Sequence, residues 1–353
     1  HRSRCMKRHD ILFCCSGPSY HHSCFSSLFG PQVYVVKEQF GLPHSLNHMC
    51  PIVIPPGYTR DYIDGKVTMN EQLGKLKAAF AELKKDTDTL IIEGTGHTGV
   101  GSIIGLNNAA AASLLEADAV LVANGGLGSA FDELELQRVM MKEHGVRIRG
   151  VILNGVLPAK RDMVQAYFTE LLAKNWGDVP LLGVVPDHSF LGQPSLEDLE
   201  DFFGGVLMTG HRDRKSHYPL DRAHLVVTDL RRFMTLLEQD HQTRTLYITH
   251  CSRDDIILGF LTHCQRMRRA NTGNFDAALL LCGHHTEDLY AAIQDVAGAT
   301  DFPVMHVPLT THATLLALRA FVPKLNRRDT VRCEAAVNHY EPFIDFDKLL
   351  GKK

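Results

Sequence analysis

Short runs of residues that are apolar throughout recur along this chain, each separated from the next by a stretch with helical spacing. In the first half the apolar runs are residues 89–92, 119–123, 150–153 and 181–185. The stretches with helical spacing are residues 68–85, 107–116, 131–144 and 163–174. Strands that are apolar on both faces and alternate with helices are typical of a parallel sheet covered on both sides. The sequence therefore predicts an α/β fold, with a parallel sheet flanked by helices.

A second, shorter series of the same kind occupies the rest of the chain. Its expected strands are residues 225–227, 245–249, 278–282 and 304–307, and its expected helices are residues 230–239, 254–269, 286–297 and 313–325. Glycines and a charged run break the pattern at 204–218, so we expect a second, smaller α/β domain to begin there. The expected organisation is an irregular or targeting-like N-terminal segment (1–32), two domains (33–208 and 218–330) and a C-terminal tail (331–353).

Composition limits the partners and the compartment. The net charge of −3 gives no electrostatic case for binding nucleic acid, and no apolar run approaches the roughly 20 residues of a membrane-spanning helix. Nine cysteines without a C-x-x-C pair favour reduced thiols in a cell interior. Residues 1–9 are basic and the chain does not begin with Met, so a remnant targeting sequence and a truncated or poorly ordered end both stay open. We expect an intracellular protein, either cytoplasmic or in a mitochondrion or plastid.

A carboxylate and a series of glycines follow the first apolar run. Glu93 comes directly after it, and Gly94, Gly96, Gly99 and Gly101 follow. A carboxylate at the end of a buried strand can hold Mg²⁺ through its oxygen or through water, and glycines let backbone N–H groups approach an anion closely. The alternative is a tight loop whose acid caps the next helix.

Polar or turn-forming residues also follow the other apolar runs. These residues are Asn124, Asn154, and Pro186 with Asp187. Ligands of open parallel sheets bind beyond the carboxyl ends of the strands, so we expect these residues and Glu93 along one rim. An Asn side chain can pair with the edge of a base through its donor and its acceptor, although Asn is also a common turn residue.

Four motifs in the first half carry a family resemblance. They are E-G-T-G at 93–96, A-D-A-V-L-V-A-N-G-G-L-G at 117–128, G-V-I-L-N at 150–154 and P-L-L-G-V-V-P at 180–186. Together they resemble the dethiobiotin synthetase and cobyrinate amidase branch of P-loop proteins, over about residues 50–203. The resemblance is greatest to the dethiobiotin-synthetase-like domain at the front of long phosphate acetyltransferases.

This resemblance implies a P-loop NTPase-like fold of the dethiobiotin synthetase type that binds ATP with Mg²⁺. It implies that Glu93 lies at the Mg²⁺-nucleotide site, that Asn154 lies near the base, and that Pro186 and Asp187 border the nucleotide. The other expected nucleotide contacts are Gly94, Gly96, Gly99 and Asn124.

The second series resembles the DRTGG domain, which follows the same domain in those acetyltransferases. The similar stretches are residues 248–257, 279–283, 303–304 and 310–314, although Cys251-Ser-Arg253 replaces the family's Gly-Asp-Arg stretch. The resemblance implies a regulatory or ligand-sensing role. Arg253 and Asp254, at an expected helix start, are candidates for gripping an anion. A helix cap with a surface ion pair is the alternative.

The phosphate-binding loop G-x-x-x-x-G-K-[ST] does not occur in the sequence. Gly17 and Gly30 are the nearest candidates, and neither has the Lys or the spacing. The missing Lys would neutralise phosphate charge, and its loss removes affinity and transition-state stabilisation. About 32 residues before Val33 are also too few for a strand, phosphate loop, helix and second strand, and the chain ends at Lys353 without an acetyltransferase domain.

The sequence therefore favours an accessory, regulatory or scaffold protein on a degenerate P-loop fold, acting with protein partners or as a homo-oligomer. The alternatives are an ATP- and Mg²⁺-dependent ligase of the dethiobiotin synthetase or cobyrinate amidase type, and a nucleotide or small-ligand sensor.

Overall fold

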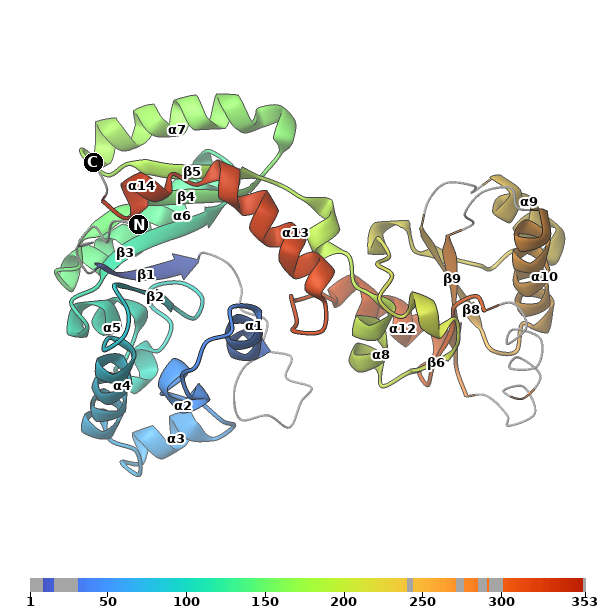
Figure 1. Ribbon diagram of the computed structural model, residues 1–353, viewed down its shortest axis with the longest axis horizontal. Coiled ribbons are helices and arrows are strands. Elements are labelled where there is room, and N and C mark those ends of the chain that lie inside the picture. The colour runs from blue at the N-terminus through green and yellow to red at the C-terminus, as the bar shows by residue number, and fades with distance from the viewer. Residues whose placement is uncertain are drawn as a thin grey trace. The chain divides into compact units, whose positions relative to one another are not determined.

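The chain folds into two compact units, each built around its own sheet. The structure, a computed structural model, describes residues 9–15, 31–239, 244–270, 276–284, 291 and 301–351. One unit contains His1–His188 and Asn326–Lys353, and the other contains Ser189–Leu325. Each has a five-stranded sheet with helices packed on it (Figure 1). The prediction of an α/β fold with a parallel sheet flanked by helices is confirmed.

The sheet of the first unit has the strand order β2-β1-β3-β4-β5. Its strands are β1 (His9–Cys15), β2 (Thr89–Glu93), β3 (Asp118–Asn124), β4 (Ile148–Val156) and β5 (Leu181–Pro186). All neighbouring strands run parallel, which suits strands that are apolar on both faces.

The expectation that residues 1–32 are irregular is wrong for β1, which pairs with β2 on one side and β3 on the other. The apolar run 11–15 is the sequence basis for this interior strand. The N-terminal segment therefore supplies part of the sheet, although Gly17 and Gly30 lie outside the described residues.

Helices cover one face of this sheet. They are α5 (Asn108–Leu114), α6 (Gly128–Glu143) and α7 (Arg161–Trp176). Leu134 of α6 and Phe168 of α7 are fully buried in the same cluster as Leu121 and Leu153 of the strands. Before them come the short helices α1 (Pro31–Gln39), α2 (Leu46–Met49) and α3 (Tyr58–Ile63), and the longer α4 (Met69–Leu83). Helix α4 begins at a capping box of Thr68 and Glu71, close to the predicted start.

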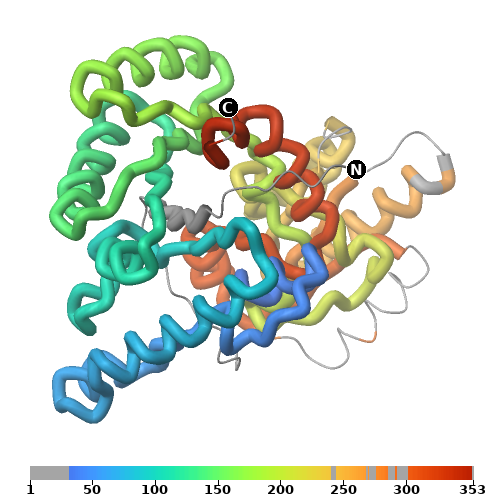
Figure 2. Tube along the Cα trace, turned by 60° about the vertical axis from the view of Figure 1, so that its left-hand side comes forward, coloured from blue at the N-terminus to red at the C-terminus, as the bar shows by residue number. Residues whose placement is uncertain are grey.

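The other face of the first sheet is covered by the C-terminal segment. This segment comprises α13 (Thr330–Tyr340), the 3-10 turn η6 (Glu341–Phe343) and α14 (Phe346–Leu349). Its apolar residues pack against Val120, Ile152 and Leu182. Figures 1 and 2 show it in red beside the green strands. The expected C-terminal tail (331–353) thus contributes, through residues 340–350, to the core of the first unit.

The sheet of the second unit has the order β6-β10-β9-β8-β7. Strands β7 (His224–Leu225), β8 (Thr245–His250), β9 (Ala277–Cys282) and β10 (Val304–Val307) are parallel, and β6 (Val206–Thr209) is antiparallel to β10. Helices α9 (Leu230–Gln239) and α10 (Asp254–Ala270) share one buried cluster with the sheet. Helices α8 (Leu196–Phe203) and α12 (Thr311–Ala320) share another.

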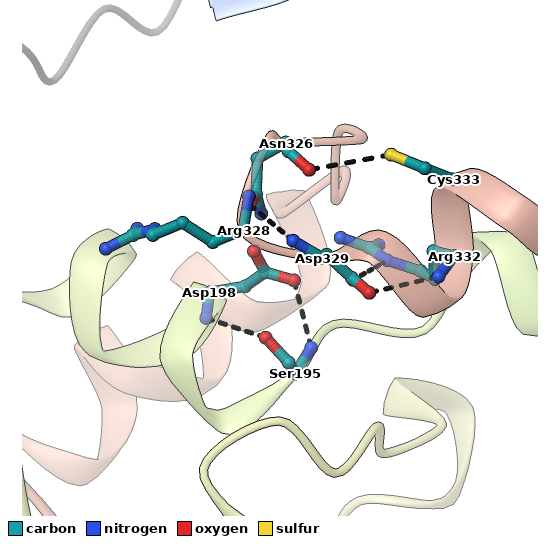
Figure 3. Close-up of polar contacts among 7 residues, drawn as sticks. All are labelled: Ser195, Asp198, Asn326, Arg328, Asp329, Arg332 and Cys333. Atoms are coloured by element: carbon teal, nitrogen blue, oxygen red, sulfur yellow. Dashed lines mark hydrogen bonds and ion pairs between the residues drawn. The ribbon is translucent and has the colours of Figure 1, made fainter. Parts of the chain in front are cut away.

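The boundary between the units therefore precedes the expected one. Residues 204–218 were expected to separate the domains, yet 206–209 form edge strand β6 of the second sheet. Helix α8 also belongs to the second unit, and its capping box joins Ser195 and Asp198 (Figure 3). Glycines and charges at 204–218 mark turns within that unit. The expected helix at 286–297 lies largely outside the described residues.

Two further expectations concerned the cysteines, which we expected to be reduced, and membrane-spanning helices, which we did not expect. Five cysteines there carry free thiols, and four of them are buried: Cys50, Cys251, Cys264, Cys282 and Cys333. Among the described helices, none combines the length and the apolar character needed to cross a membrane.

We expect the protein to become more stable when one buried polar side chain of α6 is replaced by an apolar one. Gln137 lies on the buried stripe with Leu134 and Met141 and is 3% exposed. Neither of its amide atoms has a hydrogen-bond partner among the residues that the structure describes. Because a buried unpaired amide costs roughly 1–3 kcal/mol, we expect Gln137→Met to raise the free energy of unfolding by about 1 kcal/mol or more.

Chemical denaturation measures this effect. Gln165→Met is the matched control, since Gln165 is exposed on α7, and its effect should stay within about 0.5 kcal/mol. A Gln137→Met variant that unfolds more easily than the wild type would mean that the amide is paired in solution.

Candidate functional site

The carboxyl ends of the parallel strands in the first unit form one rim. Glu93 ends β2 and lies in register with Phe13 of β1, while Asn124 of β3 lies in register with Asn154 of β4. Pro186 ends β5 and pairs with Val156 of β4. The predicted residues therefore share the rim, as the alternating pattern implied.

The order of the strands indicates which part of this rim would hold a ligand. The chain passes from β1 to β2 on one side and then to β3 on the other side of β1. Connections that leave neighbouring strands in opposite directions open a crevice between them, and ligands of open α/β sheets bind in such crevices. The carboxyl ends of β1 and β3 therefore flank the natural ligand position, with Glu93 beside it on β2.

The loop after Glu93 (residues 94–107, called here the Glu93 loop) is held by hydrogen bonds among its own residues and by the side chain of Asn108, the first residue of α5. The Asn108 side chain donates hydrogen bonds to the carbonyl oxygens of Thr95 and His97, at 3.1 and 3.0 Å. The backbone N–H of Gly99 donates to Nδ1 of His97 at 3.2 Å, and Ser102 Oγ donates to the carbonyl of Gly99 at 2.7 Å. Sequence reasoning missed Asn108, whose only signal was its place at an expected helix start.

Two of the loop glycines are required by this internal packing. A Cβ on Gly94 would lie 2.9 Å from Cγ of Asn108, in the space that the bracing amide occupies. Gly101 has a φ of 95°, and a Cβ there would lie 2.2 Å from the carbonyl oxygen of Leu106. The shape of the loop explains these glycines without any bound phosphate. Gly96 lies in the same loop.

Helix α4 braces the far end of the loop. Gln72, which is almost completely buried, donates from Nε2 to the carbonyl of Ile104 at 3.1 Å. Its Oε1 accepts a hydrogen bond from the Tyr58 hydroxyl of α3 at 3.2 Å. The loop is therefore a fixed part of the fold, tied to two helices that precede it in the chain.

The loop after β3 approaches the end of β4 closely. The N–H of Gly125 donates to the carbonyl of Asn154 at 2.6 Å. A Cβ on Gly125 would lie 2.6 Å from Cα of Val156, so only glycine fits between the two strands. Asn124 and Asn154 are thus held at fixed positions on neighbouring strand ends.

The C-terminal segment contacts the part of the rim formed by β4 and β5. The Tyr340 hydroxyl donates to Oδ1 of Asn154 at 3.0 Å. Nε2 of His339 lies 2.8 Å from the carbonyl oxygen of Pro186, and because a carbonyl only accepts, Nε2 must donate. The N–H of Asp187 donates to the carbonyl of Val156 at 2.8 Å. Nothing in the sequence pattern linked residues 339 and 340 to this rim.

Glu93 fits the protein part of a magnesium site. Its side chain is exposed at the end of β2, and Mg²⁺ at nucleotide sites is usually held by one or two carboxylates together with phosphates and waters. No group of three or more His, Cys, Asp or Glu residues that could hold a metal ion occurs within the described ranges. The other ligands of a Mg²⁺ ion bound with a nucleotide at Glu93 would be phosphate oxygens and waters.

In the second unit, Arg253 takes part in a local ion pair. Its Nε and a terminal nitrogen each lie 2.8 Å from the carboxylate of Asp255, and the terminal nitrogen also donates to the carbonyl of Thr228. The hydrogen bond to Asp255 raises the pKa of Arg253, and the same contact lowers the pKa of Asp255. Asp254 is the exposed first residue of α10. The guanidinium is thus engaged within its own helix start.

A surface depression of about 550 Å³ lies on α7, and none of the predicted site residues lines it. Its lining residues are Arg161, Asp162, Gln165, Ala166 and Thr169. Since they lie within the first nine residues of one helix, the depression is a feature of that helix surface.

Comparison with known proteins identifies what the first unit resembles. Residues 27–195 match a family model described as an AAA domain. The chain is 25% identical over 155 residues to the ATP-dependent dethiobiotin synthetase of Methanococcus vannielii, which covers 43% of the chain and 71% of that protein. It is 26% identical over 170 residues to the enzyme of the same name from Methanocaldococcus jannaschii, covering 48% of the chain and 74% of that protein.

A longer match extends beyond the first unit. The chain is 22% identical over 284 residues to the phosphate acetyltransferase of Nitratidesulfovibrio vulgaris, which covers 78% of the chain but 39% of that protein. The chain therefore spans well under half of that relative. Residues 27–195 thus match an AAA-domain family model, and the α/β fold of the first unit, with its parallel sheet flanked by helices, is consistent with the P-loop NTPase-like fold of the dethiobiotin synthetases that the chain resembles at low identity.

Proposed function

We infer that this protein is an accessory or regulatory scaffold built on a degenerate P-loop NTPase fold, and that it does not turn over ATP. The observation that carries this proposal is the Glu93 loop, whose glycines Gly94 and Gly101 are needed for its own packing. The loop therefore requires no nucleotide to explain its composition. The sequence also has no G-x-x-x-x-G-K-[ST] motif to neutralise phosphate charge.

The second unit supports a regulatory role by resemblance. The match to a phosphate acetyltransferase is too long to be confined to the first unit, and the DRTGG-like stretches lie in the second. A regulatory scaffold of this kind would act through protein partners or as a homo-oligomer. The pairing of Arg253 with Asp255 favours a structural role for that arginine over anion binding.

An ATP-dependent ligase is the second candidate. Glu93 is exposed at the end of β2, next to β1 and on the same rim as Asn124 and Asn154. This is the position that a magnesium-binding carboxylate needs in a phosphoryl-transfer enzyme. The similarity to two relatives, both ATP-dependent dethiobiotin synthetases, supports this alternative.

An ATP-turnover assay separates the two candidates. We expect the wild type with Mg²⁺ and ATP to release phosphate no faster than the Glu93→Gln variant, which keeps the size and polarity of the side chain but removes its charge. The reason is that phosphoryl transfer depends on cationic stabilisation of the developing charge. Phosphate release by the wild type that falls about 100-fold or more in Glu93→Gln would contradict the scaffold proposal and favour the ligase.

A further inference from the structure

Three of the four edges of the two described sheets carry a feature that hinders pairing with another strand. In the first sheet, Gly183 of edge strand β5 forms an antiparallel bridge with Ile344 of the C-terminal segment. In the second sheet, the N–H of Leu207 on edge strand β6 donates to Oε1 of Glu200 at 2.7 Å. The other edge strand of that sheet, β7, has two residues. Covered, charged and very short edges are the usual protection against unwanted strand pairing.

Strand β2 forms the fourth edge, beside β1 (Figure 1), and has none of these features. Its five residues pair with β1 in an unbroken register and include no Pro, Lys or bulge. On the outer side, the backbone of residues 89–92 has no hydrogen-bond partner within the part of the chain that the structure describes. No residue of β2 is fully buried, whereas β3, β4 and β5 each contain at least four buried residues. Residues 89–92 therefore offer backbone donors and acceptors to an added strand.

Apolar side chains of β2 lie on both faces of the sheet at this edge. Ile92 packs against the buried cluster that the strands share with α5, α6 and α7. Since successive strand residues alternate between faces, Ile91 lies on the opposite face, where its side chain is 63% exposed. An added strand with apolar residues at alternate positions would place one of them beside Ile91, and cross-strand neighbours of this kind stabilise a sheet.

Carboxylates stand at both ends of β2. Asp86 and Asp88 precede the strand, Glu93 ends it, and all three are exposed. The lysine nearest to them in the sequence, Lys85, forms an ion pair with Glu82. If β2 paired with β2 of a second copy, the carboxylates of the two copies would come together and repel each other. Lys or Arg side chains at the ends of an added strand would instead be attracted, so the charges select a basic partner over a second copy.

We propose that the outer edge of β2 binds an extended segment of a partner protein, in which alternating apolar residues are flanked by Lys or Arg. Backbone hydrogen bonds to residues 89–92 hold the segment, the apolar contact with Ile91 fixes its register, and the basic ends face the carboxylates. The inference deepens the proposed function and rests on it in one respect, that a scaffold needs a surface for its protein partner. Phosphate release that depends on Glu93 would overturn the proposed function alone, since the experiments on the edge use no nucleotide.

Fluorescence anisotropy of the full chain with a labelled peptide, acetyl-Lys-Val-Thr-Val-Thr-Val-Lys, tests the proposal. We expect saturable binding with a Kd below about 1 mM, and about tenfold or more weaker binding in Ile91→Lys, because a lysine on an edge strand opposes pairing and repels the basic ends. Ile63→Lys is the matched control, since Ile63 of α3 is 67% exposed, and it should change the Kd less than about twofold. The same peptide with Glu at both ends should bind at least about fivefold more weakly than the Lys peptide.

A second measurement, on the wild-type chain, does not depend on how the variants fold. The Lys peptide at saturation should slow hydrogen exchange of alternate amides in β2, because every second residue of an edge strand directs its backbone groups outward. The proposal is overturned by no saturable binding, by equal effects of Ile91→Lys and Ile63→Lys, by equal affinity for the two peptides, or by unchanged exchange in β2. A dimer in sedimentation that Ile91→Lys dissociates would also overturn it, since a second copy would then occupy the edge.

Discussion

Gly101→Ala is expected to lower the free energy of unfolding by about 3 kcal/mol or more. The glycine has a φ of 95°, and the added methyl group would lie 2.2 Å from the carbonyl oxygen of Leu106. Both Ile104 and Leu106 donate backbone hydrogen bonds to the carbonyl of Gly101, so the turn cannot move without losing them. Steric overlap with backbone and an unfavourable φ act together here. Urea denaturation gives the change directly.

Gly74→Ala is the control, and we expect it to raise the free energy of unfolding where Gly101→Ala lowers it. Gly74 lies in the interior of α4 on its exposed side, and a Cβ there has nothing within 4 Å. Alanine is favoured over glycine in a helix by about 1 kcal/mol, so this variant should be more stable than the wild type. If Gly101→Ala were as stable as the wild type, the Glu93 loop would not depend on its internal packing, and the main support for a non-catalytic role would be lost.

Arg332→Met is expected to cost about 3–5 kcal/mol. The Arg332 side chain is completely buried and its Nε pairs with Oδ2 of Asp329, whose side chain is 6% exposed. Oδ1 of the same carboxylate caps α13 by accepting the N–H of Arg332 at 3.0 Å (Figure 3). Removing the guanidinium takes from a buried carboxylate the counter-charge that Arg332 supplies, and such a loss is strongly destabilising.

The double variant Arg332→Met/Asp329→Asn separates the charge from the cap. Asn keeps a side-chain oxygen that can cap α13 but carries no charge. We expect the double variant to recover at least half of the stability lost in Arg332→Met, as measured by denaturation. Equal losses in the single and double variants would show that packing of the long side chain, and not the buried charge, sets the cost.

The local pattern of the sequence was sufficient to predict most elements of both sheets. Strand β8 and helix α9 lie within a residue of their expected positions, because an apolar run and an amphipathic period are properties of consecutive residues. The start of helix α4 at Thr68 could also be predicted from the sequence, since a capping box depends on two residues that lie three positions apart.

The features that the sequence did not predict depend on contacts between distant residues. Strand β1 was missed because basic and Cys/Ser/His-rich residues surround its short apolar run. The C-terminal segment was expected to be a tail, because nothing within residues 330–350 indicates that Ile344 pairs with Gly183. The domain boundary was misplaced because an edge strand bounded by glycines, here β6, looks like a linker in sequence.

The candidate site also combines features that the local sequence predicted with features that depend on contacts between distant residues. The positions of Glu93, Asn124, Asn154 and Pro186 on one rim followed from the alternation of strands and helices. The bracing of the loop by Asn108 and the contacts of Tyr340 with Asn154 could not be predicted, because each joins separate parts of the chain through side chains.

Equilibrium binding of Mg²⁺-ATP to the wild-type protein tests the central claim most directly. Calorimetric titration should show no saturable binding up to about 1 mM ATP, the upper end of the range in which enzymes commonly half-saturate with substrate. Saturable binding in the micromolar range that is lost in Glu93→Gln would contradict the account, because it would mean that the rim of the first sheet still holds a metal-nucleotide complex.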